Sequence, residues 1–497
     1  MRRALFRNYM QIILVLLIAL SCLGCGMGSS SSMNGYGGEF GATQGGVQDM
    51  GLARELIENG RVPPAEAFTV EGMFSEHDLP LNGPPCSRLL CLRAALGIAP
   101  TLEGNTRGWL QVGMSSTINP DHFQRPPITL IAVVDVSGSM GWDYSSPNVE
   151  YPEPGALSRS LLTAVATQLG SADHIAIVTY GSNVNTLLSL TPGNNRQAIE
   201  NAIDSLDSNG STNMEAGLAR AYSIARNVGS GMGDVRLMLF TDVQPNVGAT
   251  SPDSFKQMAQ DGADAGIGLT VMAVGVGLGQ EVLNAMVNLR GGNAFSLFKN
   301  EDVEQIMEDD WPWLVSPIAY DLSVELSLPS TFKVAESYGF PGEDPGLEVA
   351  TVFLSKRKGA LLLGLSPLPK SNLQELGITL NLSYKTPENE SVTDEIHVAY
   401  NNEPLDDSGM FFQQFSVGKA VALAILVSNM KIAAEKYSSE REKAVAIMQA
   451  VVARISADAA VAGNEALLPE EELAQNLLQL MEQGAEQGDL YEYGRGY

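Results

Sequence analysis

Between residues 127 and 316 the sequence alternates regularly between two patterns. Four short runs are almost continuously apolar, as expected for strands buried on both faces: 128–134, 175–180, 237–240 and 269–276. Five other segments place apolar residues at helical spacing: 156–169, 196–206, 215–226, 254–264 and 280–289. Strands and helices that alternate in this way form a parallel sheet with helices on both faces. We therefore predict an α/β domain with a doubly wound, mostly parallel, Rossmann-like sheet.

The regions around this domain have other patterns. Residues 51–126 hold a short helical pattern and then segments broken by Gly and Pro, which predicts a small helix plus a β-rich region. Residues 317–405 alternate apolar and polar positions, which predicts a β-sandwich-like region. Residues 406–497 are helical with an acidic tail. Within them the apolar segment 415–427 is expected to be a buried helix, because it contains Lys419 and is short for a membrane span.

The first 25 residues have the layout of a secretory signal. Basic residues precede an apolar run at 12–20, which is too short to span a membrane as a mature helix, and Cys22 and Cys25 follow. A small residue directly before a cysteine resembles the bacterial lipobox, in which that cysteine is lipidated. An ordinary cleaved signal peptide is the alternative. Residues 26–50 are rich in Gly and Ser, which predicts a flexible tether.

These features together predict an exported lipoprotein of the bacterial cell envelope, at the periplasmic face or in the outer membrane. Contact with the membrane is then expected through the N-terminal lipid anchor only. In such an oxidising compartment, Cys86 and Cys91 are expected to form a short-loop disulfide, with two buried free thiols as the alternative. No cysteine spacing typical of a zinc site is present.

The charge balance narrows the classes of partner. The chain has 57 Asp and Glu against 30 Lys and Arg. Such an acidic excess disfavours binding to nucleic acid or to anionic lipid through a basic face. Cations and basic partners are favoured instead.

Five residues with oxygen-bearing side chains lie at the ends of predicted strands or just before a predicted helix of the α/β domain. Asp135, Ser137 and Ser139 follow the first apolar run, Thr212 precedes a helical segment, and Asp242 follows the run at 237–240. In an extended segment alternate residues share one side, so the first three side chains can face one point. Ligands of such sheets bind at the carboxyl ends of the strands. Hydroxyls and carboxylates without imidazole or thiolate suit Mg²⁺, with Mn²⁺ or Ca²⁺ as alternatives.

This constellation resembles the metal-ion-dependent adhesion site of the von Willebrand factor type A (VWA) domain, whose pattern is Asp-x-Ser-x-Ser, then Thr, then Asp. The resemblance implies that Ser137, Ser139 and Thr212 bind the metal directly and that Asp135 and Asp242 often act through water. It also implies that a protein partner offers a carboxylate to the open position of the metal. The chain is further similar to bacterial exported VWA lipoproteins, through the Gly-Arg-Val-Pro-Pro turn at 60–64 and the segment 352–364.

Two features depart from the family pattern. The family usually has Thr-Asp-Gly at this point, whereas this chain has Thr241-Asp242-Val243. Val243 thus replaces the usual glycine, and the turn after Asp242 lacks the conformational freedom of glycine. The loop 141–155 is long, and it is either a cover for the binding face or an insertion without contact to a ligand.

The sequence contains no catalytic set. His77, His122, His174 and His397 are scattered, and an enzyme would need an acid/base pair that only Asp143 or Glu150 could supply near the metal. We therefore expect a non-catalytic protein that binds a protein partner through Mg²⁺. The alternative is a structural assembly protein in which the metal only stabilises the fold.

Overall fold

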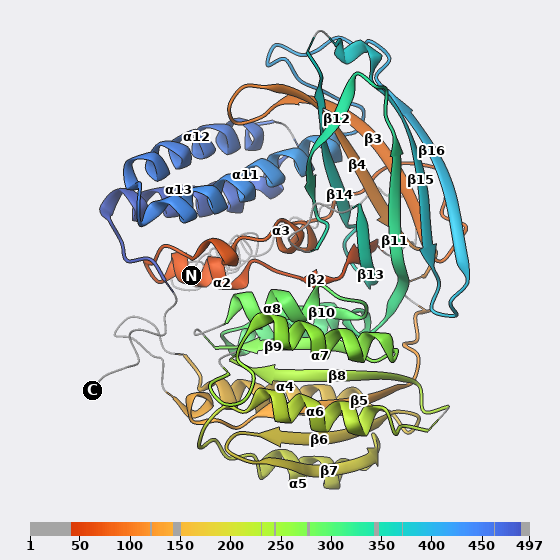
Figure 1. Ribbon diagram of the computed structural model, residues 1–497, viewed down its shortest axis with the longest axis vertical. Coiled ribbons are helices and arrows are strands. Elements are labelled where there is room, and N and C mark those ends of the chain that lie inside the picture. The colour runs from red at the N-terminus through yellow and green to blue at the C-terminus, as the bar shows by residue number, and fades with distance from the viewer. Residues whose placement is uncertain are drawn as a thin grey trace, which may run out of the picture. The chain divides into compact units, whose positions relative to one another are not determined.

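The computed structural model describes residues 41–119, 122–142, 151–229, 231–242, 245–275, 279–341, 347–369, 371–461 and 463–488. The expected signal segment with Cys22 and Cys25, most of the tether, Val243, and residues 143–150 of the long loop lie outside these ranges, and so do Asp143 and Glu150. The described residues belong to one compact unit. Figure 1 shows its two sheets and its layer of C-terminal helices.

Seven strands form the sheet that carries the expected metal site, called sheet B below. Their order is β2-β10-β9-β8-β5-β6-β7, and every neighbouring pair is parallel except β6 and β7. The bounds in this order are Gly46–Val47, Gly292–Leu297, Gly268–Val274, Asp234–Thr241, Ile128–Asp135, His174–Tyr180 and Val184–Pro192. The predicted mostly parallel sheet is confirmed, while β2, β7 and β10 are strands that the apolar runs did not indicate.

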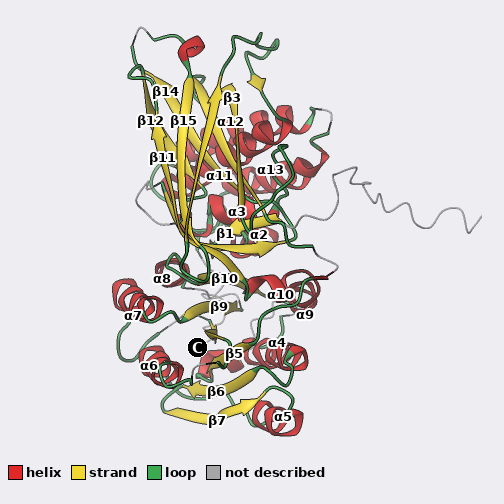
Figure 2. Ribbon diagram, turned by 90° about the vertical axis from the view of Figure 1, so that its right-hand side faces the viewer, coloured by secondary structure: helices red, strands yellow, loops and turns green. Residues whose placement is uncertain are grey.

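Helices cover both faces of sheet B, as Figure 2 shows. The helices α6, α7 and α8 pack on one face and α4, α5, α9 and α10 on the other. Their bounds are Met214–Ala225, Pro252–Asp264 and Gln280–Val287 on the first face, and Pro154–Gln168, Arg196–Asp204, Asn300–Gln305 and Trp311–Leu314 on the second. Residues of β5 alternate between the two cores, with Ile131 and Val133 in one and Leu130 and Ala132 in the other. The predicted doubly wound fold is therefore confirmed.

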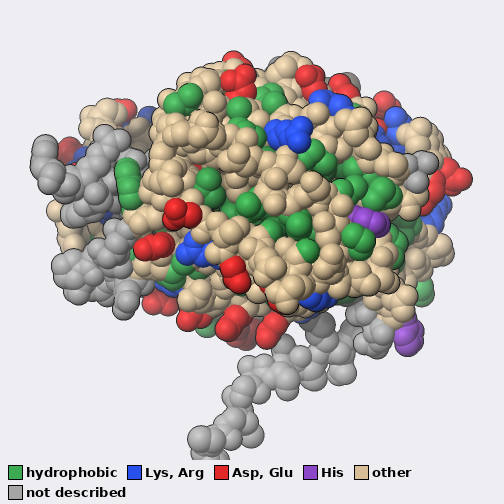
Figure 3. Space-filling view, turned by 90° about the horizontal axis from the view of Figure 1, so that it is seen from below, with side chains coloured by type: hydrophobic (Ala, Val, Ile, Leu, Met, Phe, Trp, Pro, Cys, Tyr) green, Lys and Arg blue, Asp and Glu red, His purple; other side chains and the backbone are tan. Residues whose placement is uncertain are grey.

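The antiparallel strand β7 forms one edge of sheet B, and β2 forms the other. Figure 3 looks onto the side of the molecule where β7 and α5 lie. Hydrophobic and uncharged side chains gather in the middle of this face, and most charged ones lie toward its margin.

A second, ten-stranded sheet (sheet A) contains the path β12-β14-β4-β1-β13-β11-β15-β16, with β3 paired to β4 and β17 paired to β3. The bounds in chain order are β1 Gly41–Gln44, β3 Cys91–Pro100, β4 Thr106–Ser115, β11 Pro317–Ser327, β12 Phe332–Tyr338, β13 Glu348–Ser355, β14 Ala360–Pro367, β15 Gly377–Lys385, β16 Ser391–Ala399 and β17 Phe411–Phe412. One core is shared by residues of β3, β4 and β14 and residues of β11 and β15. The Tyr384 hydroxyl of β15 also donates a hydrogen bond to the Leu90 carbonyl, 2.9 Å away, just before β3.

The structure corrects the predicted division of these β regions. Strands β3 and β4 from residues 51–126 are continuous with the strands of residues 317–405 in one sheet, so the two ranges are not separate β units. Sheet A, one continuous ten-stranded sheet, is thus built from both parts of the chain. The reason is that β4 pairs with β14, from Leu365↔Gly108 to Ala360↔Gly113. These strands are separated in sequence by about half the length of the chain, so no local pattern indicates that they pair. Cys86 and Cys91, which precede and begin β3, form a disulfide bond.

Three helices pack beside sheet A: α11 (Phe415–Tyr437), α12 (Arg441–Ala459) and α13 (Leu468–Gln483). Of the helices described, α11 alone is long and apolar enough to cross a membrane, with mean hydropathy 1.5 over its most apolar window, but 72% of that window is buried inside the protein. Lys419 of α11 is also buried, and its ammonium lies 3.3 Å from the Asp78 carbonyl, to which it donates. This arrangement is that of a core helix.

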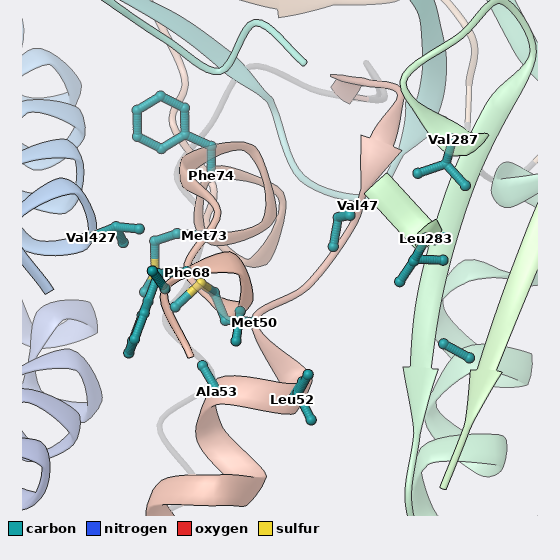
Figure 4. Packing of buried hydrophobic residues seen from close by; sticks show 14 of the residues in the cluster. Val47, Met50, Leu52, Ala53, Phe68, Met73, Phe74, Leu283, Val287 and Val427 are labelled. Carbon is teal, nitrogen blue, oxygen red and sulfur yellow. The ribbon is translucent and has the colours of Figure 1, made fainter. Parts of the chain in front are cut away.

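An N-terminal segment joins the two sheets. Strand β1 pairs with β13 of sheet A, and after a single residue β2 pairs with β10 of sheet B. The predicted flexible tether at 26–50 is therefore wrong for residues 41–47, because these residues pair with strands far away in the sequence. The helices α2 (Gly51–Glu58) and α3 (Val70–Glu76) follow. Figure 4 shows their apolar side chains between Val427 of α11 and Leu283 of α8. The segment 41–76 therefore packs against both the parallel sheet domain and the C-terminal helices.

Candidate metal centre

The site lies at the point where the order of strands reverses. The chain passes from β5 to β6 on one side and later returns to β8 on the other side of β5. The carboxyl ends of β5 and β8 therefore meet, which is where doubly wound sheets bind ligands. Asp135 is the last residue of β5, and Asp242 comes directly after β8.

The loop after β5 holds three of the predicted ligands close together. One carboxylate oxygen of Asp135 accepts the Ser137 backbone N–H at 2.8 Å, and the other accepts the Thr241 hydroxyl at 3.1 Å. The Ser137 and Ser139 Oγ atoms lie 3.1 Å apart. The predicted extended conformation of residues 135–139 is wrong for the end of the segment, because residues 138–141 form a 3₁₀ turn. The turn, rather than the two-residue period of a strand, brings the second serine beside the first.

Backbone hydrogen bonds bring the loop of Thr212 to this turn. The Gly138 N–H donates to the Gly210 carbonyl at 2.9 Å, and the Asn209 N–H donates to the Val136 carbonyl at 2.7 Å. Gly210 has φ +90°, and a Cβ there would lie 2.3 Å from the Ser182 Oγ. Glycine is therefore required for this close approach. Thr212 itself is buried.

Asn246 lies in the loop after β8 and is hydrogen-bonded to Thr212, although no sequence motif indicated it. Its side-chain oxygen accepts the Thr212 N–H at 2.9 Å, and its own backbone N–H donates to the Thr212 carbonyl at 3.1 Å. The two ligand-bearing loops are thus tied to each other through one residue. The only sequence signal was an Asn four positions after Asp242.

Both carboxylates of the site are buried, with 1% of Asp135 and 1% of Asp242 exposed. Burial raises the pKa of Asp135, although hydrogen bonds from Ser137 and Thr241 oppose the shift. Burial and the charges of Asp135 and Asp242 hold the pKa of the Tyr180 hydroxyl well above its usual value. Tyr180 therefore stays neutral at ordinary pH, and a cation bound beside Asp135 and Asp242 would favour the charged forms of these buried carboxylates.

The donor set fits a small hard cation. Two ligands in adjacent positions of an octahedral Mg²⁺ lie about 3.0 Å apart, given metal–oxygen distances of about 2.1 Å. The 3.1 Å between the Ser137 and Ser139 Oγ atoms is close to that value. Among the described residues there is no cluster of three or more His, Cys, Asp and Glu able to hold a metal. A site here must then use hydroxyl oxygens together with its two carboxylates.

Comparisons with known proteins show which proteins the sheet domain resembles. The family model described as von Willebrand factor type A domain matches residues 130–244. The chain is 27% identical over 279 residues to an uncharacterized protein of Escherichia coli K12, YfbK, a match that covers 55% of this chain and 47% of that protein. It is 24% identical over 218 residues to a UPF0353 protein of Mycolicibacterium paratuberculosis, covering 39% of this chain and 63% of the relative. The chain thus spans only about half to two thirds of these bacterial relatives.

Among solved structures, a von Willebrand factor type A protein from Catenulispora acidiphila has a similar fold. The TM-score is 0.51 at 12% identity, and the match covers 81% of this chain and 98% of the other. VWA domains commonly bind divalent metal ions and mostly serve in protein interaction or adhesion. The strand order, the family model and the solved structure lead to one conclusion: this chain contains a domain of the von Willebrand factor type A family.

Proposed function

We propose that this protein is a non-catalytic binding module that captures a protein partner through Mg²⁺. The Mg²⁺ site consists of Asp135, Ser137, Ser139, Thr212 and Asp242. The observation that carries the proposal is the spacing of 3.1 Å between two serine hydroxyls beside two buried carboxylates. When bound, the metal supplies an open position that a carboxylate oxygen of the partner can fill.

The residues of the chain have separate tasks in this proposal. Hydrogen bonds from the Ser137 N–H and the Thr241 hydroxyl orient the Asp135 carboxylate and leave lone pairs for water or metal. The Asn246 side chain accepts the Thr212 N–H and so fixes the Thr212 backbone, which positions the Thr212 hydroxyl before any ligand binds. Three neutral hydroxyls and only two carboxylates leave the cation able to attract a third negative group.

The central test is Mg²⁺-dependent capture of envelope proteins by the purified full chain. Asp242→Ala and Ser137→Ala are expected to abolish capture, whereas the exposed Asp253→Ala on α7 serves as the matched control and is expected to retain it. Capture that survives both site substitutions and a chelator would refute the metal bridge. A metal-linked gain in stability without metal-dependent capture would support the structural assembly role instead.

We propose further that the protein is exported and held at the bacterial envelope by a lipid on Cys22 or Cys25. The basic residues, short apolar run and cysteines at the N-terminus support this. Membrane fractionation of cells that express Cys22→Ala, Cys25→Ala or both is the test. Membrane attachment of the double variant would contradict lipid anchoring at these positions.

A further inference from the structure

In the described part of the VWA domain two large hydrophobic side chains are exposed, and both lie on loops that carry residues of the proposed metal site. Of the described residues in 127–316, Trp142 (40% exposed) and Val247 (41%) are the large apolar residues with substantial exposure. Trp142 follows the serine turn after β5, and Val247 lies in the loop after β8. The other exposed large hydrophobic residues of the described chain lie in sheet A, in the C-terminal helices or in the segments that connect them.

Each of these residues is bonded through its backbone to a ligand residue of the proposed site. The Trp142 N–H donates to the Ser139 carbonyl at 3.1 Å, and the Val247 N–H donates to the Thr212 carbonyl at 3.2 Å. Their backbones are therefore held at fixed positions, one hydrogen bond away from two of the metal ligands. Trp is enriched among the residues that dominate binding energy at protein interfaces.

On the side of β6 and β7, the surface beside the start of the loop after β5 is almost uncharged. A cavity of about 270 Å³ lies where the loop after β5 meets the β6–β7 turn, and Ser182, Asn183, Asn185 and Asn209 line it with a single acidic residue, Asp207. Amide and hydroxyl groups can bond a partner's backbone without selecting its charge. The chain as a whole has net charge −27, so a strongly acidic partner would be repelled at long range.

We propose that the partner presents one Asp or Glu between two apolar side chains, in the order apolar-x-acid-x-apolar along an extended segment. This inference rests on the metal-bridged capture proposed above. In an extended segment, residues two positions apart share a side and lie about 6.6 Å apart. Residues three apart in a turn have Cα atoms within about 7 Å of each other. The Cα atoms of Ser139 and Trp142 are thus separated by about the same distance as alternate residues of an extended segment. The carboxylate binds the metal, and the flanking apolar groups contact Trp142 and Val247.

Two synthetic peptides test the proposal: Gly-Leu-Gly-Asp-Gly-Leu-Gly and Gly-Ser-Gly-Asp-Gly-Ser-Gly. With the full chain and saturating Mg²⁺, isothermal titration is expected to show at least about tenfold tighter binding of the leucine peptide, in line with the loss on truncating central apolar contacts. Trp142→Ala and Val247→Ser are expected to reduce this preference and to leave Mg²⁺ binding unchanged. Val334→Ser, an exposed valine of β12, is the matched control and is expected to keep the full preference.

The outcomes separate this inference from the proposed function. Metal-dependent binding of both peptides with equal affinity would overturn the apolar flanks and leave the metal bridge standing. Binding that Asp242→Ala does not weaken would refute the metal bridge. Binding of neither peptide in saturating Mg²⁺ would count against both. A preference for leucine that persists in the Trp142 and Val247 variants would place the apolar contacts elsewhere.

Discussion

Tyr151, near the end of the long loop that follows the proposed metal site, is hydrogen-bonded to the N-terminal segment. Its hydroxyl donates to the Glu55 carboxylate of α2 and accepts from the Asn59 side chain. The second oxygen of Glu55 pairs with the Lys299 ammonium at 3.0 Å. Tyr151 and Glu55 are both buried. Tyr151→Phe therefore removes one hydrogen bond to a buried carboxylate and one from a neutral amide.

The expected loss follows from these partners. A hydrogen bond to a charged group contributes about 1.5–3 kcal/mol, and one between neutral groups contributes about 1 kcal/mol. Asn59 keeps bonds to the Glu55 carbonyl at 2.8 Å and to its carboxylate at 2.9 Å, so its share of the loss is small. We expect Tyr151→Phe to lower the free energy of unfolding by about 2–3 kcal/mol.

Urea unfolding followed by tryptophan fluorescence measures this loss, with Tyr384→Phe as the matched control. The Tyr384 hydroxyl is also buried but donates to a neutral carbonyl, so its removal is expected to cost only about 1 kcal/mol. A double-mutant cycle with Glu55→Gln then isolates the pair, and a coupling of at least about 1 kcal/mol is expected. Equal losses in the two tyrosine variants, or no coupling to Glu55, would refute the reasoning.

Three further predictions concern the site and the junction of the sheets. Gly217→Ala places a Cβ 2.6 Å from the ring of Tyr180, the residue of β6 that pairs with Asp135, so urea unfolding should show a loss of about 1–3 kcal/mol from overpacking; Gly229→Ala, with its nearest atom at 3.8 Å, should be close to neutral. Burial raises the pKa of Asp49 to about 6, above that of an unfolded aspartate, so its ionised form costs stability near pH 7; this cost begins to fall as the pH drops through 6 and is gone only below the pKa of the unfolded aspartate, about 3.9. From pH 7 to pH 5 the wild type should therefore gain about 1 kcal/mol relative to Asp49→Asn in urea melts, and a relative loss would contradict the shift. At a free Mg²⁺ concentration one hundred times the dissociation constant, thermal and urea unfolding should show about 2.7 kcal/mol of added stability, which a chelator or Asp242→Ala removes; an unchanged gain in that variant would exclude Asp242 as a ligand.

Local patterns in the sequence predicted most of the strands and helices of the α/β domain. Strands buried on both faces must be apolar at nearly every position, and β5 is buried at all eight of its residues, so the run at 128–134 was visible without any structure. The predicted helix at 254–264 corresponds to α7, which begins at Pro252 with the Ser251 side chain accepting the Ser254 N–H. Strand β7 was missed because each of its residues is half-buried or exposed, so no continuous apolar run marks it.

The residue types of the candidate site were also readable from the sequence, because hydroxyls and carboxylates at strand ends have a recognisable order. Their geometry was not. The 3₁₀ turn at 138–141, the hold of Asn246 on Thr212 and the anchoring of Tyr151 to α2 all depend on contacts between segments far apart in the chain. The same holds for the pairing of β4 with β14, which merges two predicted β regions into one sheet.

By itself, the sequence determined the strands β5, β6, β8 and β9 and the helices α4 to α8 of the VWA domain, and it showed which side chains are available to a cation. Only the tertiary structure decided the strand order that brings Asp135 beside Asp242, the membership of β3 and β4 in sheet A, and the places of Trp142 and Val247 beside the ligand residues. The physical reason is that hydrophobic periodicity reports the burial of each element by itself. Pairing and loop contacts instead depend on partners tens to hundreds of residues away, about which a local pattern carries no information.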